Sequence, residues 1–454
     1  FRATHPLFTL IQQERTNEFI RTFLRQYKEG GQLPIWELAA NYTGCMIGYH
    51  AIPVIADAYA KGIRDYDTDL ALEAMVHSAM QDDLGLKSYK ENGFIAASDE
   101  PESVSKNLEY AYDDWCIALL ADSLGNEEIA TTFYERGQYY KNLFDPSTGF
   151  FRAKKSHTWF APFMPEEVNF NYTEANAWQY SLFVPQDISG HIKLMGGAKN
   201  YEQHLDNMFS ASTKTSGREQ PDVTGLIGQY AHGNEPSHHM AYLYNYVGKP
   251  HKTQKIVRQI LDEQYTHLPD GLSGNEDCGQ MSSWYVLSAM GFYSVTPGLD
   301  YYTIGTPLFE KATLNLENGN TFVLKAKNVS DKNIYIQSAT LNGVDFNQSF
   351  IKHQSIIDGG ELIFTMGNTP SSWASNSIPY SAITKNEIVA VPYFVSESQT
   401  FTDKLSIELG SAVGGDIYYI INDDKEKIYE TTIVITADAN ISCRIQKGEK
   451  WSKQ

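Results

Sequence analysis

Two carboxylates in separate polar segments have the surroundings that acid–base chemistry needs. Glu174 lies among aromatic residues such as Trp178, which lower the local dielectric and raise the pKa of a carboxylic acid, as a proton donor requires. Asp277 lies in the glycine-bracketed sequence GNEDCG, directly before an apolar helical stretch, where free N–H groups and the helix dipole keep a carboxylate ionised. One protonated and one ionised carboxylate are the minimum for glycoside hydrolysis.

Each of these residues also has a simpler interpretation. Asp277 could be only the N-cap of the following helix, and Glu174 could be an exposed loop residue. The neighbouring Glu276 should point elsewhere on such a tight loop. We therefore interpret Glu276 either as a residue that supports the site from behind or as a contact to substrate hydroxyls, rather than as a second base.

Oxygen ligands occur in a third segment, IGQYAHGNEPSHHMAYLYNY, at residues 227–246. Asn234 and Glu235 stand beside a glycine and offer oxygen donors without thiolates, which suits Ca²⁺ better than zinc. His232 and His238 do not have the spacing of a zinc protease motif, and we favour contacts to sugar hydroxyls or packing for them. We expect His239, at the edge of the apolar face, to be structural.

Two further segments hold charged residues whose role the pattern leaves open. In residues 35–53 we expect Trp36 to pack in the structure, whereas Glu37 and His50 could either pack or line a site. Asp113 and Asp114 fall in the middle of a helical stretch with no local basic partner. A buried polar network is the first interpretation of this pair, and a position lining the site is the second.

The composition is that of a large globular protein. The chain has 454 residues, 42% of them hydrophobic, and no run is long enough to span a membrane. A net charge of −19 disfavours nucleic acid and anionic lipid as partners. The 29 Tyr, 22 Phe and 7 Trp are compatible with sugar binding, because pyranose rings stack on aromatic side chains. The four cysteines have no CxxC spacing, which argues against a zinc site or a disulfide framework.

Helical periodicity dominates residues 10 to 296, and strand-like alternation follows it. The helical segments are separated by the long loops 144–180, 210–236 and 266–279, and the clearest of them lie at residues 46–63, 107–125, 252–265 and 282–293. Alternating runs at 321–328 and 333–346, the latter with an Asn342-Gly343 turn, predict antiparallel strands. Similar runs at 404–410, 416–423 and 430–437 predict a further small β domain, with a boundary near Val391-Pro392. We thus predict an (α/α)6 toroid over 1–296, a β domain over 297–385 and a small β-sandwich over 386–454.

Several long motifs closely resemble glycoside hydrolase family 92, a family of calcium-dependent exo-α-mannosidases. They are NYTEANAWQYSLFVP, GQYAHGNEPSHHMAYLYNYVGKP, GNEDCGQMSSWYVLSAMGFY, SVSKNLEYAYDDWCIALLA and the opening FRATHPLFTL. The resemblance covers about residues 1–385. It implies hydrolysis of terminal α-linked mannose from N-glycans or mannans, with inversion, by a bacterial enzyme secreted to the periplasm or beyond the cell. The stretch HGNEPSHH is similar to members that act on α-1,2 linkages.

The resemblance also assigns roles to individual residues. Glu174 matches the general acid and Asp277 the general base, while Asn234 and Glu235 fall in the segment tied to a Ca²⁺ site to which Asp277 also contributes. The substrate-binding residues implied with them are Arg2, His50, Trp178, His232, His238 and Glu276.

Three departures from the family pattern qualify this expectation. Many members have GDED where this chain has Asn275-Glu276-Asp277, which leaves Asp277 as the only aspartate, and Ala175 replaces a frequent glycine. The opening motif WDTFR is present only from its Phe and Arg, so we expect the preceding N-terminal β-sandwich of the same protein to be missing. Two other functions stay open: a toroid glycosidase without a metal, and a glycan-binding protein that does not cleave.

Overall fold

The computed structural model describes residues 1–396, 398–422 and 424–454. Its first three hundred residues are mainly helical. The α-helices are α1 (Thr4–Ile11), α2 (Gln13–Gly30), α3 (Ala51–Ala60), α4 (Thr68–Ala79), α5 (Leu86–Asn92), α6 (Ser103–Ser123), α7 (Glu127–Arg136), α8 (Ala177–Tyr180), α9 (Ile188–Leu194), α10 (Ala198–Ser210), α11 (Pro250–Glu263), α12 (Gln280–Met290) and α13 (His353–Ile357). The 3-10 helices are η1 (Tyr139–Leu143), η2 (Pro185–Asp187), η3 (Glu235–Ser237) and η4 (Met240–Val247).

The predicted helices at 107–125 and 252–265 are confirmed, and local chemistry explains their ends. Helix α6 ends at Ser123, just before Gly125, and the next helix starts where the Asn126 side chain accepts a hydrogen bond from the Ile129 N–H (3.2 Å). Helix α11 has Pro250 in its first turn, where a missing N–H is no loss. The helix predicted at 282–293 is one turn shorter at its end, because Gly291 adopts a φ of 103°.

The helix predicted at 46–63 is wrong in its first part. Helix α3 begins only at Ala51, and Met46 and Gly48 have φ values of 72° and 77° that no helix contains. A β-carbon on Gly48 would lie 2.4 Å from the imidazole of His50, so only glycine lets that ring fold back over the loop. The loop therefore places His50 beside helix α6 instead of on a helix face.

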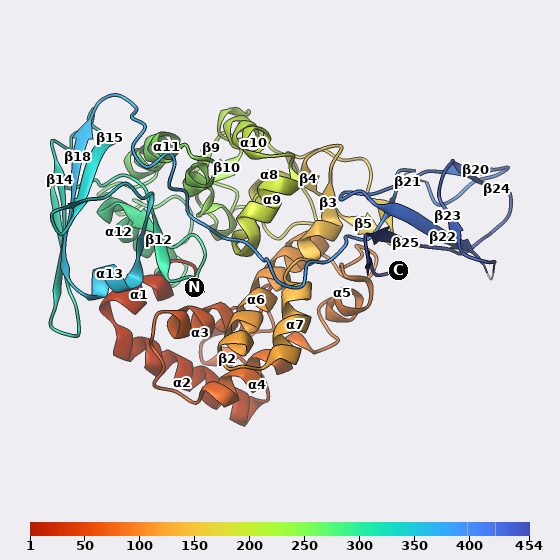
Figure 1. The fold of residues 1–454 in the computed structure, drawn as a ribbon, viewed down its shortest axis with the longest axis horizontal. Helices are drawn as coiled ribbons and strands as arrows, with labels where there is room; N and C mark the ends of the chain where they lie inside the picture. Colours follow the sequence, from red (N-terminus) through yellow and green to blue (C-terminus); the bar gives the residue numbers. More distant parts are fainter. Residues whose placement is uncertain (397, 423) are drawn as a thin grey trace.

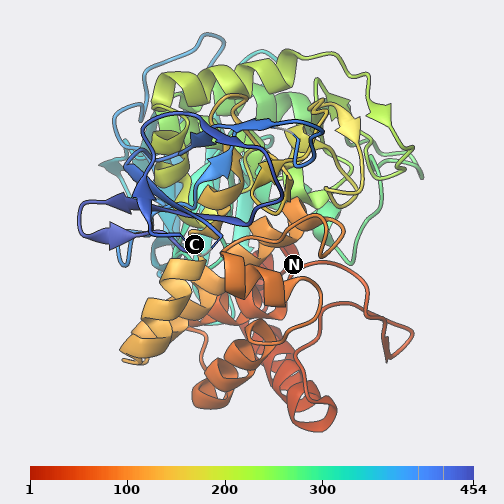
Figure 2. The same cartoon turned by 90° about the vertical axis from the view of Figure 1, so that its right-hand side faces the viewer.

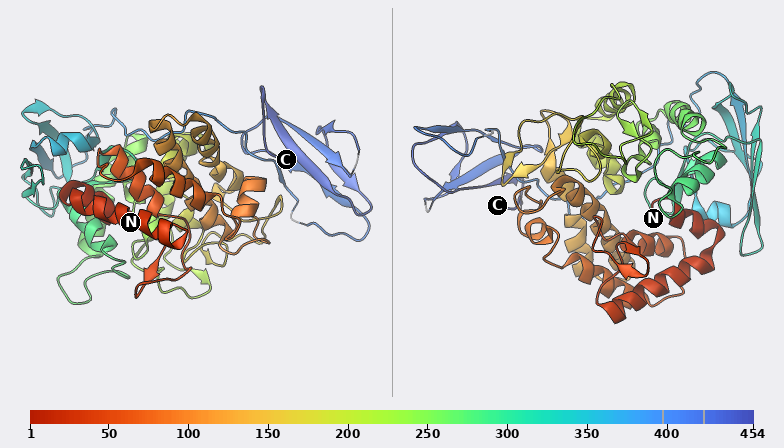
Figure 3. Two further views of the ribbon diagram at one scale, coloured as in Figure 1. Left: turned by 90° about the horizontal axis from the view of Figure 1, so that it is seen from below. Right: turned by 180° about the vertical axis from the view of Figure 1, so that it is seen from behind.

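The helices curve around the N-terminal residues. Helix α1 packs against α2, α3 and also α12, so the first and last helices of this part are neighbours. Helix α6 is buried along nearly its whole length and contacts α3, α4 and α7. Figure 1 and the right panel of Figure 3 show the chain start lying between the red and orange helices on one side and the green helices on the other. Among the described residues, no helix combines the length and apolar character needed to cross a bilayer.

Short strand pairs occupy the long loops of the helical part. They are β1 (Glu37–Leu38), β2 (Asn41–Tyr42), β3 (Phe144–Asp145), β4 (Phe150–Phe151), β5 (Lys154–Lys155), β6 (Thr158–Trp159), β7 (Glu167–Val168), β8 (Ser216–Gly217), β9 (Leu226–Ile227) and β10 (Tyr230–Ala231). Strand β7 pairs with β8, so the loops 144–180 and 210–236 are joined to each other by backbone hydrogen bonds, and β9 pairs with β10 within the second loop. This pairing holds the loop that carries Glu174 against the loop before Asn234.

A five-stranded sheet follows the helices, in the order β13-β14-β18-β15-β16. Its strands are β13 (Lys311–Asn315), β14 (Thr321–Lys327), β15 (Tyr335–Leu341), β16 (Val344–Asp345) and β18 (Gly360–Gly367). The predicted strands and the Asn342-Gly343 turn are confirmed, with positive φ values at both turn residues. The prediction of purely antiparallel pairing is wrong, because β14 runs parallel to β18.

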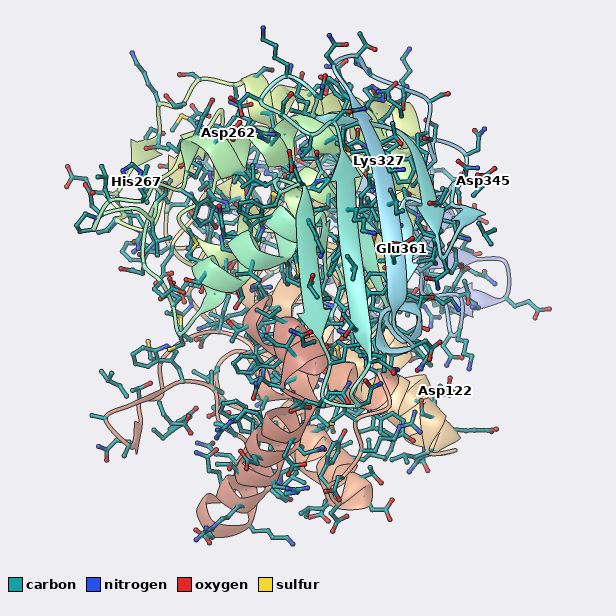
Figure 4. All side chains as sticks on the ribbon, turned by 90° about the vertical axis from the view of Figure 1, so that its left-hand side faces the viewer. Asp122, Asp262, His267, Lys327, Asp345 and Glu361 are labelled. Atoms are coloured by element: carbon teal, nitrogen blue, oxygen red, sulfur yellow. The ribbon has the colours of Figure 1, made fainter. Side chains whose placement is uncertain are left out.

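This sheet shares one hydrophobic core with helices of the preceding part. Buried residues such as Phe322, Leu324 and Phe364 belong to the same cluster as Val257 and Ile260 of α11. The sheet thus packs on helix α11. Its other face carries charged residues, and Figure 4 labels Lys327 and Glu361 there. A smaller sheet of β11 (Phe292–Tyr293), β12 (Tyr301–Ile304) and β17 (Phe350–Lys352) joins the end of α12 to this region.

The last residues form a separate small β unit with its own core, made by residues such as Ile407, Ile433 and Ile445. Its strands are β19 (Tyr393–Phe394), β20 (Leu405–Ile407), β21 (Leu409–Gly410), β22 (Asp416–Ile421), β23 (Lys427–Ile428), β24 (Ile433–Ile435), β25 (Ile441–Lys447) and β26 (Lys450–Trp451). The runs predicted at 404–410, 416–423 and 430–437 are found as strands, although residue 423 lies outside the described residues. Figure 2 views the molecule from the side of this unit.

The segment at the predicted boundary near Val391-Pro392 packs against both the helical part and the C-terminal unit. Val389 belongs to the core of the C-terminal unit, whereas Val391 belongs to the helical core. Strand β19 pairs in parallel with β6, which gives a four-stranded sheet in the order β21-β19-β6-β5 across the two parts. The C-terminal unit is therefore attached by strand pairing as well as by a linker.

Candidate active site

Glu174 and Asp277 both precede a helix in left-handed backbone. Glu174 has a φ of 49° and comes just before α8, whose Asn176 and Gln179 form a capping box. Asp277 has a φ of 51° and precedes α12. Such backbone angles cost a residue other than glycine about 1 kcal/mol or more, and the surrounding structure must supply that energy. Both carboxylates are therefore held in place by their loops.

The segment Gly233–Glu235 connects these two carboxylates. The side-chain amide of Asn234 donates hydrogen bonds to the carbonyl and to Oε2 of Glu174, each at 3.3 Å. The next residue, Glu235, has its carboxyl group within hydrogen-bonding reach of Asp277. A β-carbon on Gly274 would lie 2.5 Å from the carbonyl oxygen of Gly233, so the two loops meet backbone to backbone. The structure thus brings Glu174, Asn234, Glu235 and Asp277 together.

The electrostatic surroundings give the carboxyl groups of Glu174 and Asp277 different pKa values. Burial raises the pKa of Glu174 to about 7, and the negative charge of Asp222 adds to the effect while the Asn234 amide opposes it. Burial, followed by the neighbouring Glu235 carboxyl, raises the pKa of Asp277 to about 6. Near neutral pH a large fraction of Glu174 carries a proton, and most Asp277 carboxyls are ionised. A general acid needs the higher pKa and a general base the lower one, and the two carboxyl groups have this order.

Arg2 and His50 lie in a polar network behind this cluster. The Arg2 guanidinium pairs with the fully buried Glu109 (Nη2 to Oε1, 2.6 Å), and the His50 ring contacts both Glu109 (3.3 Å) and Asp113 (2.9 Å). The Arg2 and His50 side chains keep 15% and 17% of their surface exposed, so each can still reach a ligand. Asp113, which is fully buried, therefore orients His50.

Asp114 takes the buried structural role that was the first interpretation of the aspartate pair. It accepts hydrogen bonds from the Tyr49 hydroxyl (2.7 Å) and from the Arg136 guanidinium (2.8 and 3.2 Å). Trp36 is 38% exposed, so the expectation that it packs is wrong. Glu37, the other open residue of that segment, is an exposed member of β1 that accepts a hydrogen bond from Gln26.

His232 and His238 are packed inside the protein, and the charge of His238 acts on Glu235 of the cluster. Both are 0% exposed. The His232 ring nitrogens contact the hydroxyls of Tyr230 (2.8 Å) and Tyr265 (2.7 Å). The His238 ring bonds to the carbonyl of His232 (2.8 Å) and the amide of Gln280 (2.9 Å). Packing, the alternative left open for them, describes them better, and His239 is buried as expected.

Trp178 and Glu276 also have structural partners. Trp178 packs on Phe150 at a centroid distance of 4.7 Å and on His204 at 5.3 Å. Glu276 accepts hydrogen bonds from the backbone N–H and the hydroxyl of Ser282 (3.2 and 2.9 Å), which satisfies the first turn of α12. Its carboxylate is thereby directed to the first turn of α12.

Sequence reasoning missed two acidic residues of the site. Asp222, in the loop 210–236, raises the pKa of both Glu174 and Asp277, and its Oδ1 accepts a hydrogen bond from Asn275 (3.2 Å). Glu109 is the partner of Arg2 from the middle of α6. The polar sequence around Asp222 has no distinguishing pattern. Glu109 carried a signal, since a charged residue on the buried face of a helix needs a partner.

The oxygen atoms at this cluster fit a hard cation in part. Two carboxylates, Glu235 and Asp277, approach each other closely, an arrangement that a proton or a bound cation must stabilise. The Asn234 amide oxygen already accepts the Glu235 N–H at 3.1 Å. Among the described residues, no group of three or more His, Cys, Asp or Glu side chains is arranged as a metal site. The donor set present therefore consists of two carboxylates and neighbouring amide oxygens, which is chemistry that Ca²⁺ accepts.

A family model described as the glycosyl hydrolase family 92 catalytic domain matches residues 1–368. The chain belongs to glycosyl hydrolase family 92. The matched range contains Glu174, Asp277 and the loops that hold them, and it ends within the segment after the five-stranded sheet. The C-terminal β unit lies beyond the family 92 match.

Relatives of known structure agree with the family 92 assignment. A family GH92 alpha-mannosidase from Bacteroides thetaiotaomicron in complex with mannoimidazole is 39% identical, with a TM-score of 0.81 over 85% of this chain and 53% of that chain. A family GH92 inverting mannosidase from the same organism is 37% identical, with a TM-score of 0.77 over 84% of this chain and 54% of that chain. An uncharacterized secreted glycosidase from Arthroderma benhamiae is 31% identical over 404 residues, which are 79% of this chain and 50% of the relative. This chain thus spans about half the length of the family 92 proteins that it matches.

Proposed function

We propose that the protein of which this chain is a part removes terminal α-linked mannose from N-glycans or mannans with inversion at the anomeric carbon. The observation that carries the proposal is the cluster in which Asn234 contacts Glu174 while its neighbour Glu235 contacts Asp277, with the pKa of the first carboxyl above that of the second. The solved family 92 relatives that are named mannosidases, one of them inverting, support the choice of sugar and of stereochemistry.

In this mechanism Glu174 donates its proton to the glycosidic oxygen as the bond from that oxygen to the anomeric carbon breaks. Asp277 removes a proton from a water molecule whose oxygen attacks the same carbon from the opposite face. A water molecule fits between the two groups when their carboxyls are roughly 6.5–9.5 Å apart. The products are a free mannose of inverted configuration and the shortened glycan.

Arg2 and His50 are proposed to bind the terminal mannose, because both reach the cluster from the network around Glu109. Ca²⁺ is proposed as cofactor, held by Glu235, Asp277 and neighbouring amide oxygens such as that of Asn234. When bound, the ion would polarise sugar hydroxyls and help distort the ring. A preference for α-1,2 linkages is proposed from the resemblance of HGNEPSHH to such members. The secreted relative and the bacterial mannosidases support a secreted bacterial enzyme.

We also propose the division into an (α/α)6 toroid (1–296), a β domain packed on it (297–385) and a small β-sandwich (386–454). The contact of α1 with α12 supports a closed ring, and the separate core of the last unit supports the third division.

The test uses the full-length protein and α-1,2-mannobiose. Glu174→Gln and Asp277→Asn should each lower kcat by about 10²-fold or more, because each removes a proton-transferring group. Asp270→Asn is the matched control, since it changes an exposed carboxylate of the loop 266–279 that also carries Asp277, and it should leave kcat nearly unchanged. Proton NMR during early turnover should show β-mannose first. A Glu174→Gln variant with full activity would refute the assignment of the acid.

Chelation separates the two enzymatic alternatives, and mannose release separates both from simple binding. Loss of activity in EDTA that Ca²⁺ restores supports the metal-dependent mechanism. Activity that is indifferent to EDTA would favour a toroid glycosidase without a metal. Tight binding of mannobiose with no release of mannose would favour a glycan-binding protein.

A further inference from the structure

A cavity of about 330 Å³ lies where the helical part meets the C-terminal unit. Its walls come from the end of α7 and from η1, from the linker near residue 387, and from β26 with the residues after it. None of these residues belongs to the cluster around Glu174 and Asp277. The volume is at the lower end of the range found for small-molecule sites, and the position between two parts of a chain is typical of such sites.

Trp451 forms an aromatic wall of this cavity and is 39% exposed. Its ring is held by two neighbours, because the Arg444 guanidinium lies 4.0 Å from the ring centre and Tyr418 packs at a centroid distance of 5.1 Å. Arg444 is itself held by Glu426 through hydrogen bonds of 2.8 and 3.0 Å. The indole is thus a rigid, partly exposed surface, which loses little conformational entropy when a ligand stacks on it.

Two carboxylates of the cavity have no partner among the residues that the structure describes. Glu135 and Glu387 are exposed, and neither side chain forms a hydrogen bond or an ion pair with any residue that the structure describes. Both side chains are acceptors only, and hydroxyl groups are natural donors to them.

Two lysines balance these charges. Lys450 donates to the backbone carbonyl of Glu387 at 2.8 Å, and the Lys453 ammonium lies 5.2 Å from the centre of the Tyr139 ring. With two acidic and two basic side chains, the lining has no net charge. Such a site favours a neutral ligand over an anion or a cation.

We propose that this cavity is a second carbohydrate-binding site, which takes one neutral hexopyranose unit of a glycan. An aromatic ring for the C–H face of the sugar, free carboxylates for its hydroxyls and a neutral lining are the features that a pyranose needs together. The site lies outside the proposed catalytic centre, so it would hold a second part of the glycan and would not take part in bond cleavage. It does not depend on the proposed catalytic mechanism.

The experiment uses the full chain carrying Glu174→Gln, so that no sugar is consumed. Methyl α-mannopyranoside, methyl α-glucopyranoside and methyl α-galactopyranoside are titrated by calorimetry, and tryptophan fluorescence is recorded in parallel. At least one of them should bind and perturb the fluorescence. Adding Trp451→Ala should weaken that binding about tenfold or more, since the stacking surface is lost.

Two further variants guard against misfolding and against binding elsewhere. Glu387→Gln changes an exposed side chain only and should weaken the same binding event with an unchanged melting temperature. Phe309→Ala, which removes an exposed aromatic side chain far along the sequence, should leave the binding unchanged. Binding that is indifferent to both Trp451→Ala and Glu387→Gln, or no saturable binding of any of the three sugars, would overturn the proposal. Because binding is measured without turnover, this result is independent of whether the enzyme proves to be a mannosidase.

Discussion

The carboxyl group of Glu235 lies within hydrogen-bonding reach of that of Asp277, so two acidic side chains from different loops meet at the proposed base. The contact makes the protonation of Asp277 dependent on its neighbours. Asp222 is a third acidic side chain that acts on Asp277, and it acts on Glu174 as well. The catalytic pH range should therefore depend on residues that do not react.

Asp222→Asn should shift the pH profile of the full-length enzyme to lower pH. The negative charge of Asp222 raises the pKa of Glu174 and of Asp277, so its removal lowers both values. The proton of Glu174 is then lost at lower pH, and the alkaline limb of kcat/KM should move in the acidic direction by several tenths of a pH unit. Asp270→Asn changes an exposed carboxylate of the neighbouring loop and should leave the profile in place. An alkaline shift would contradict the prediction.

Glu174→Gln should raise the free energy of unfolding at pH 8, compared with the unchanged protein at the same pH. At pH 4 the difference between the two proteins should be smaller. Burial raises the pKa of Glu174 from 4.5 to about 7, so the folded state binds this proton more tightly than the unfolded state. The stability from that proton is complete below pH 4.5 and is lost as the pH rises through 7. Because the side chain is only partly buried, we expect a gain of about 1–2 kcal/mol at pH 8. Urea unfolding at both pH values measures it, and equal effects at the two values would refute it.

Gly274→Ala should separate the two catalytic loops. A β-carbon there would lie 2.5 Å from the Gly233 carbonyl oxygen and 2.8 Å from its Cα, and the φ of 94° is itself strained for alanine. We expect a loss of about 2–4 kcal/mol in unfolding free energy and a strong loss of kcat/KM. Gly31→Ala is the matched control, because Gly31 has a φ of 85° with nothing within 4 Å of the added carbon. It should cost about 1 kcal/mol and leave kcat/KM unchanged.

Asp113→Asn and Asp114→Asn should have different effects, although the residues are adjacent. Asp114→Asn leaves the buried Arg136 charge without its partner and should cost about 3–5 kcal/mol of stability, with normal kcat/KM per folded molecule. Asp113→Asn disturbs the hydrogen bond that orients His50 and should lower kcat/KM about tenfold through misplacement of the sugar. Similar kcat/KM losses for both variants would show that the pair acts as one structural unit.

Residues with a local signal could be predicted from the sequence. The helices at 107–125 and 252–265 and the Asn342-Gly343 turn were placed correctly, because helical periodicity, the terminal Gly125 and the turn residues are signals within the local sequence. Glu174 and Asp277 were selected from their aromatic and glycine surroundings, the structure brings their loops together, and their catalytic roles stay a prediction.

Features that depend on distant contacts could not be predicted in this way. The helix predicted across Gly48 failed because its backbone follows the His50 ring, which is directed by Asp113 of another helix. For His232 the sequence left sugar contacts and packing open, and the deciding partner is Tyr265, which follows α11 and contacts the second ring nitrogen. A local sequence pattern does not show which distant residue forms a hydrogen bond with a given side chain.

The junction between the helical part and the C-terminal unit would fix the distance between the two proposed sugar-binding places. Alternate residues of one segment enter two separate cores, and β19 continues a sheet begun by β6, so the two parts cannot swing relative to each other as they would on a free linker. A sugar held beside Trp451 would then sit at a constant span from the loops of Glu174 and Asp277. The length of a glycan branch, and not only its terminal linkage, would then decide whether the glycan binds at the catalytic centre and beside Trp451 at the same time.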